Sequence, residues 1–68
     1  MRQFDPCEIV VDLNPKILKG TRGTILEVYE GGKAFEVEFM DEEGENISYK
    51  GQLTFLVSKD QIKPVSDN

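Results

Sequence analysis

The stretch GTILEVYEGGKAFEVEF, residues 23–39, constrains the fold more than any other part of this chain. Its second half, AFEVEFM, alternates between apolar and acidic side chains. Successive side chains of a β-strand point to opposite faces of its sheet, so this alternation predicts a strand over residues 34–40 with one face in the core. The first half predicts a strand over residues 24–29, but its apolar residues do not alternate cleanly. A β-bulge, or burial on both faces, would account for that irregularity.

Turns and further strands surround this pair. The dipeptide Gly31-Gly32 predicts a two-residue hairpin turn, because glycine readily adopts the positive φ that such turns require. CEIVVDL predicts an earlier strand over residues 7–13, and NISYKGQLTFLV predicts a long strand over residues 46–57 that Gly51 bends or divides.

The end of the chain predicts one turn of helix and a last strand. Ser58 and Gln61 have the spacing of a helix capping box, which predicts one short helical turn. IKPV, residues 62–65, then predicts an edge strand, where a proline is tolerated. We expect residues 1–4 and 66–68 to fray, as chain termini do.

The chain is short for a free-standing domain. It has 68 residues, one cysteine and no histidine, so it has no intrachain disulfide and lacks the commonest zinc ligand. A domain of this size buries only about 60% of the surface of its unfolded chain. The exposed edges of such a small sheet need protection, and closing the sheet into a barrel provides it. The sequence predicts one all-β domain over residues 1–68, a small SH3-like barrel of five to six short antiparallel strands with one short helical turn before the last strand.

Composition narrows the possible partners. The net charge of −5 disfavours nucleic acid, and no apolar run approaches the roughly 20 residues of a membrane span. The first residues, MRQFDPCEIV, lack the apolar core of a signal peptide, so we expect a cytoplasmic protein. We expect no cofactor, no small-molecule substrate and no membrane partner.

Acidic residues form the first candidate site. Asp41, Glu42, Glu43 and Glu45 offer carboxylates to a cation, but they lack the alternating spacing of a calcium loop. We interpret them as a solvated hairpin tip. Pairs of carboxylates such as Glu36 and Glu38 suit acid–base chemistry, but a small barrel fills its interior and leaves no pocket for it, so we expect a polar outer face.

Cys7 has no histidine to activate it as a nucleophile. It lies on the apolar side of its predicted strand, where a buried cysteine behaves as a small hydrophobic residue. We therefore expect a buried thiol and no catalytic residue in this chain.

Aromatic and basic residues form the remaining candidates. Tyr29 and Tyr49 suit a groove for a peptide, although the tryptophan typical of proline-reading grooves is absent. In the segment KGTRG, the glycines with Arg22 and the flanking Lys19 suit a phosphate or a carboxylate held on backbone amides. The structural alternative is a turn demanded by barrel closure, in which Gly20 and Gly23 adopt positive φ.

The motifs KGTRGTILEVYEGGKAFEVEFMDEEG and DQIKPV together resemble a set of small bacterial proteins, the domain of unknown function 4926. The resemblance runs from about Phe4 to Val65. Residues 7–18 are loosely similar to the family, and the strand predicted over residues 46–57 is longer than is usual there. It implies an SH3-like barrel in a bacterial cytosol and no assigned activity. Some relatives resemble accessory genes on mobile gene cassettes or beside toxin-like genes.

These observations favour a non-enzymatic binding or accessory module that acts by protein–protein contact. We expect it to use an unpaired sheet edge and apolar residues, namely Ile17, Leu18 and Leu56, either for a protein partner or for self-association into an oligomer. One alternative is nucleic-acid binding through the Lys16–Arg22 loop, as in KOW-type barrels. Another is an accessory or antitoxin-like inhibitory subunit whose acidic turn, with Glu42 and Glu43, meets a basic site.

Overall fold

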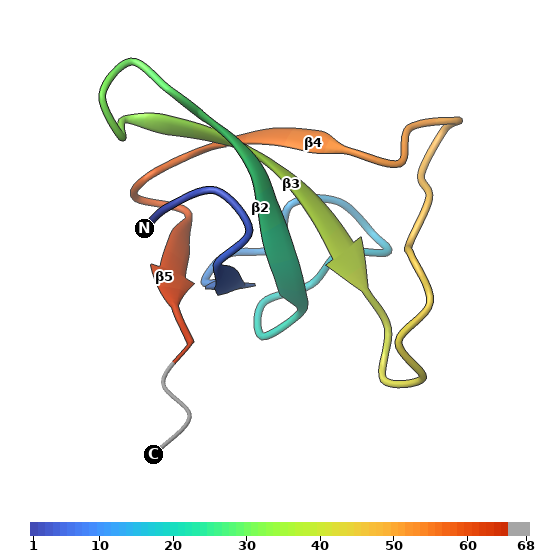
Figure 1. Cartoon of the computed structure of the whole chain (residues 1–68). Coiled ribbons are helices and arrows are strands. Elements are labelled where there is room, and N and C mark those ends of the chain that lie inside the picture. Colours follow the sequence, from blue (N-terminus) through green and yellow to red (C-terminus); the bar gives the residue numbers. More distant parts are fainter. Residues whose placement is uncertain (66–68) are drawn as a thin grey trace.

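The alternating segment forms strand β3 (Ala34–Met40), with the predicted bounds and with every second residue buried. A computed structural model describes residues 1–65 of the chain, so the expectation for residues 66–68 lies outside the described part. All pairings in the sheet are antiparallel, and the strand order is β4-β3-β2-β1-β5 (Figure 1). The other four strands are β1 (Pro6–Ile9), β2 (Arg22–Tyr29), β4 (Phe55–Ser58) and β5 (Ile62–Pro64).

Strand β2 begins two residues before the predicted strand and carries the bulge that its apolar pattern suggested. The pairing register with β3 shifts between Ile25 and Glu27, so Leu26 has no partner residue. An extra residue in one strand re-aims the side chains that follow it. The non-alternating pattern of the sequence is therefore the signature of this bulge.

The inner face of the sheet forms one hydrophobic core. Its members come from all five strands and from one loop residue, Ile17. Gly23 of β2 lies in the most crowded part, because a Cβ there would lie 2.6 Å from the Glu38 carbonyl oxygen. The prediction of positive φ holds for Gly20, at 98°, but is wrong for Gly23, where close packing requires the glycine instead. The buried core residues are Cys7, Ile9, Ile17, Ile25, Phe35, Val37, Phe39, Phe55, Val57 and Ile62.

The β2–β3 turn is longer than the predicted two residues. Four residues, Glu30 to Lys33, separate the paired residues Tyr29 and Ala34. Glu30, Gly31 and Gly32 have consecutive φ values of 51°, 67° and 97°. The Tyr29 carbonyl accepts hydrogen bonds from the N–H groups of Gly32 and Lys33, at 3.0 and 3.2 Å. The two glycines permit this left-handed turn, and the flanking strands end at Tyr29 and begin at Ala34, as predicted.

The strand predicted over residues 7–13 ends at Ile9. Beyond it the Val10 N–H donates to the Gln61 carbonyl, and Val11 is exposed. The Ile9 carbonyl accepts from the Gly20 N–H at 2.8 Å, so the chain turns away there into a loop. The apolar alternation continues past Ile9, but contacts with distant segments end the strand.

The long strand predicted over residues 46–57 is wrong. Gly51 does divide this segment, because Tyr49 and Gln52 close a two-residue turn in which Lys50 and Gly51 both have positive φ. The part before that turn makes only isolated bridges, and the regular strand β4 begins at Phe55. Positive φ at two adjacent residues is incompatible with a continuous strand.

The predicted helical turn is also absent. Three residues join β4 to β5, and they form a turn closed by one hydrogen bond from the Gln61 N–H to the Ser58 carbonyl, at 3.0 Å. The reciprocal bond expected of a capping box is present, because the Ser58 N–H donates to Gln61 Oε1 at 2.9 Å. The connection is too short for a helix, since the next residue, Ile62, already pairs with Ile9 of β1.

Candidate functional site

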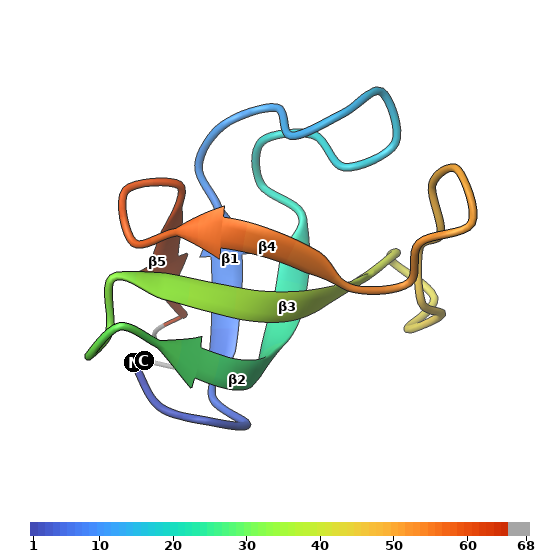
Figure 2. The same ribbon diagram turned by 90° about the horizontal axis from the view of Figure 1, so that it is seen from above.

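The two long loops leave the sheet at the same end. The β1–β2 loop (residues 10–21) and the β3–β4 loop (residues 41–54) lie opposite the short β2–β3 turn (Figure 2). In an antiparallel sheet with consecutive strands paired, every second connection falls at the same end. This end of the molecule, which we call the loop end, holds both pockets described below.

Internal hydrogen bonds fix the β1–β2 loop in place. Asn14 Oδ1 accepts from the N–H groups of Lys16 and Ile17, both at 2.9 Å, and Asp12 Oδ1 accepts from the Lys19 N–H at 2.8 Å. Ile17 is fully buried in the core, so its predicted role on an interaction surface is wrong. Leu18, its neighbour, is 50% exposed. The loop is therefore anchored by one apolar residue and presents the next one to solvent.

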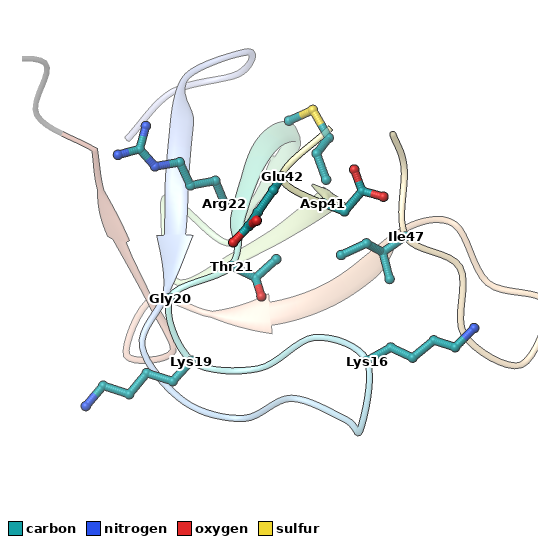
Figure 3. Close-up of a pocket in the computed structure, with 9 residues that line it drawn as sticks. Lys16, Lys19, Gly20, Thr21, Arg22, Asp41, Glu42 and Ile47 are labelled. Atoms are coloured by element: carbon teal, nitrogen blue, oxygen red, sulfur yellow. The ribbon is translucent and has the colours of Figure 1, made fainter. Parts of the chain in front are cut away.

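The first pocket is lined by two charged segments that are far apart in the sequence, the basic end of the β1–β2 loop and the acidic turn that follows β3. It has a volume of about 600 Å³ and brings Lys19 and Arg22 beside Asp41 and Glu42. Figure 3 shows the Glu42 carboxylate directed toward Thr21, whereas the ends of the basic side chains point away from one another. We call this the charged pocket. Its lining comprises Lys16, Lys19, Gly20, Thr21, Arg22, Met40, Asp41, Glu42 and Ile47.

The charges around this pocket do not form ion pairs. Within residues 1–65, the salt bridge is the one between Lys63 Nζ and Glu8 Oε2, at 3.6 Å. Asp41 instead shapes its own turn, because its Oδ1 accepts from the N–H groups of Glu43 and Glu45 at 2.9 and 3.0 Å. Glu42 and Glu43 are exposed, and Glu42 alone of these two lines the pocket.

The second pocket is mainly apolar and has a volume of about 400 Å³. Tyr49 packs against the core there, with Lys50 Nζ 5.4 Å from its ring centroid. Leu56 of β4 lines the same pocket, although its side chain is 69% exposed. We call this the apolar pocket. Its lining comprises Leu13, Asn14, Tyr49, Gln52, Phe55 and Leu56.

The two predicted tyrosines do not share a site. Tyr29 ends β2 beside the short turn, whereas Tyr49 lies in the β3–β4 loop at the loop end. The Tyr29 hydroxyl donates to Glu36 Oε1 at 2.8 Å. This hydrogen bond, assisted by the nearby negative charges, raises the pKa of Tyr29 above its usual value. An aromatic groove built from both tyrosines is therefore wrong, and Tyr49 lines the apolar pocket without Tyr29.

Cys7 is fully buried, as predicted. Burial raises the pKa of its thiol from about 9.0 to about 11, and a hydrogen bond from the Gly23 backbone partly opposes that rise. The thiolate is the reactive form, so this thiol is a poor nucleophile at neutral pH.

Residues of the apolar pocket were the hardest to find from sequence. Leu13 and Gln52 come from segments that the hydrophobic pattern assigns to strands. The one available signal was Asn14 before Pro15, which marks a turn. Nothing in the sequence shows that this turn faces the residues around Tyr49.

Comparison with known proteins identifies the family. Residues 3–51 match the family described as Domain of unknown function (DUF4926). The chain belongs to this family. The matched region spans β1 to β3, both segments of the charged pocket and the turn at Gly51, so β4, β5 and the closing DQIKPV lie outside it. No curated protein and no solved structure matches the chain.

Among residues 1–65, no group of three His, Cys, Asp or Glu side chains is placed to hold a metal ion. Within the same residues, no helix has the length and apolar character needed to cross a membrane.

Proposed function

We propose that this DUF4926 protein is a non-enzymatic module that binds another protein through its loop end. The observation that carries the proposal is a group of exposed leucines there. Leu18, Leu53 and Leu56 expose 50%, 55% and 69% of their surface. Leu56 lies directly on the apolar pocket. Single exposed leucines are ordinary, but an exposed leucine on an apolar hollow, with two more on the neighbouring loops, is typical of interaction sites.

We also propose that the domain is an SH3-like barrel. The support is its strand order, in which β5 returns across the molecule to pair with β1 while β1 to β4 follow one another. Strand β1 pairs with β2 through three residues and with β5 through three residues, so both of these pairings are short. Such an arrangement leaves a rigid body whose loops are free to vary.

Protein is a better-supported partner than nucleic acid. Lys16, Lys19 and Arg22 line one pocket, but Asp41 and Glu42 line it with them. A phosphate backbone entering that pocket would meet carboxylates as well as amines. The net charge of −5 adds repulsion at long range.

The test combines native mass with capture from a bacterial lysate at low and high salt. We expect the purified chain to capture a specific protein, and the double variant Leu18→Ser, Leu56→Ser to lose at least tenfold of that capture. The matched control is Val28→Ser at the short-turn end, which is also partly exposed and should leave capture unchanged. A strictly monomeric protein that captures nothing at either salt contradicts the proposal.

The same experiment separates the alternatives. Capture of nucleic acid that falls steeply with salt would replace protein binding by phosphate binding. Charge reversal at Glu42 and Glu43 tests the accessory or inhibitory reading. That reading fails if the reversed variant captures the same partner as strongly as the wild type does.

A further inference from the structure

Strand β4 is an edge strand whose backbone faces can be assigned from the ladder. Residues opposite each other in an antiparallel pair alternate between exchanging hydrogen bonds and facing away. The Lys59 N–H donates to the Lys33 carbonyl at 3.0 Å, one step beyond the β3–β4 register. Val57 and Phe55 therefore bond to β3, and the backbone groups of Leu56 and Ser58 face the open side.

The backbone N–H and carbonyl of one of these two residues, Ser58, already have hydrogen-bond partners within the chain. The Ser58 N–H donates to Gln61 Oε1, and the Ser58 carbonyl accepts from the Gln61 N–H. Leu56 has no such partner within residues 1–65. It is thus the residue of β4 whose N–H and carbonyl both remain open, and an open edge is a template for another strand.

The side chains around Leu56 indicate what such a strand would carry. On the outer face, the pairing register places Glu36 of β3 beside Leu56, and Glu27 of β2 beside Glu36. Phe55, whose side chain points to the other face, lines the apolar pocket, and Leu56 lines it too, so the pocket lies at this edge of the sheet. A strand beside β4 would therefore meet negative charge on one face and an apolar hollow on the other.

We propose that the open edge of β4 accepts an extended, basic segment of a partner protein as an added strand. The residue opposite Leu56 exchanges two backbone hydrogen bonds with it and carries Lys or Arg toward Glu36. The adjacent residue points to the other face and places an apolar side chain in the apolar pocket. This mode of recognition combines main-chain bonds with alternate side-chain specificity, and it rests on the proposed function.

A second copy of this chain fits the edge less well. Two β4 strands paired through Leu56 would share the same two backbone hydrogen bonds as the proposed partner, so charge and not backbone bonding distinguishes the two occupants. Each copy also carries a net charge of −5, so pairing would bring like charges together. A basic segment meets the same edge with complementary charge.

The test selects a random heptapeptide phage library against the wild-type protein. We expect the enriched peptides to alternate Lys or Arg with apolar residues. Leu56→Pro removes an N–H that faces away from β3, which edge strands tolerate, and should weaken these peptides at least tenfold. Leu56→Ser keeps the N–H and should weaken them about threefold. Circular dichroism checks that both variants fold.

Several outcomes would overturn this inference. They are a library with no enrichment above background, enriched peptides that are acidic, or peptides that bind Leu56→Pro as tightly as wild type. A wild-type dimer that Leu56→Pro dissociates would assign the edge to a second copy. Should Leu56→Pro fail to fold, a selected peptide N-methylated opposite Leu56 replaces it, and unchanged binding of that peptide contradicts strand addition.

This inference and the proposed function can fail separately. A lysate protein that binds wild type and Leu56→Pro equally leaves the proposed function standing and overturns strand addition. A lysate that yields no protein partner removes the proposed function by its own test.

Discussion

The β2–β3 hairpin and the loop end differ in how each uses its residues. In the hairpin, alternate residues of β3 are buried, and Gly23 of β2 lets the two strands meet closely. At the loop end the backbone turns repeatedly, leucines are exposed and charges stay unpaired within the described residues. From this difference we expect stability to be concentrated in the hairpin, and the exposed leucines of the loop end support the proposal that a partner binds there.

The substitution with the largest expected effect on this contrast adds a side-chain atom where the two strands of the hairpin are closest. Gly23→Ala would place a Cβ 2.6 Å from the Glu38 carbonyl oxygen and 2.8 Å from Val37 Cγ1. We expect a loss of about 3 kcal/mol in the free energy of unfolding, because the backbone must move. Urea denaturation measures it. Gly44→Ala in the β3–β4 loop is the control, with open space around it and φ of 84°, and should cost only about 1 kcal/mol of strain. Equal losses would contradict the contrast between the regions.

Alkaline pH should weaken the same part of the core. The folded-state pKa of Cys7 is raised from 9.0 to about 11, so the folded protein holds the proton more tightly than the unfolded chain. The stabilisation is complete below pH 9 and is lost as pH rises toward 11, by roughly 2 to 3 kcal/mol. Urea denaturation at pH 8, 9.5 and 11 would show this. Cys7→Ala should remove that part of the pH dependence, and an identical pH profile in both proteins would contradict it.

Two adjacent residues of the β1–β2 loop, one buried and one half-exposed, test the same contrast with smaller expected changes in stability. Ile17→Val removes a methylene group from a fully buried side chain and should cost about 1 kcal/mol. Leu18→Ala removes more atoms from a half-exposed side chain but should change stability by no more than about 0.5 kcal/mol. Thermal unfolding of both variants gives the answer. A larger loss for Leu18→Ala would mean that Leu18 is covered in solution.

The smallest effect concerns the outer face of the hairpin. Tyr29 donates to Glu36, and its pKa is raised. Glu36→Gln removes the negative charge, so the Tyr29 pKa should fall back toward its ordinary value. Ultraviolet titration of the phenol follows this, with Tyr49→Phe to isolate the signal. An unchanged titration would show that the two side chains do not meet in solution.

The alternation in the sequence predicted the central strand well, whereas contacts between distant segments were predicted poorly. AFEVEFM yields β3 with its bounds because its alternation and its burial agree. CEIVVDL alternates equally well, yet its strand stops at Ile9, where Gly20 and Gln61 meet the chain. The apolar pocket brings Asn14 close to Tyr49, and no spacing in the sequence reveals that meeting. An alternation of apolar and polar residues indicates which face of a strand is buried. The position of a loop depends instead on contacts with residues that are distant in the sequence.

The open edge at Leu56 is tested most directly by residue-resolved amide exchange, in the free protein and with a selected basic peptide. The account predicts fast exchange at Leu56 and exchange at least about a hundredfold slower at Val57, which bonds to β3. Addition of the peptide should slow Leu56 and leave Val57 unchanged. Slow exchange at Leu56 in the free protein, or no change on peptide binding, would contradict the claim that this edge receives a partner strand.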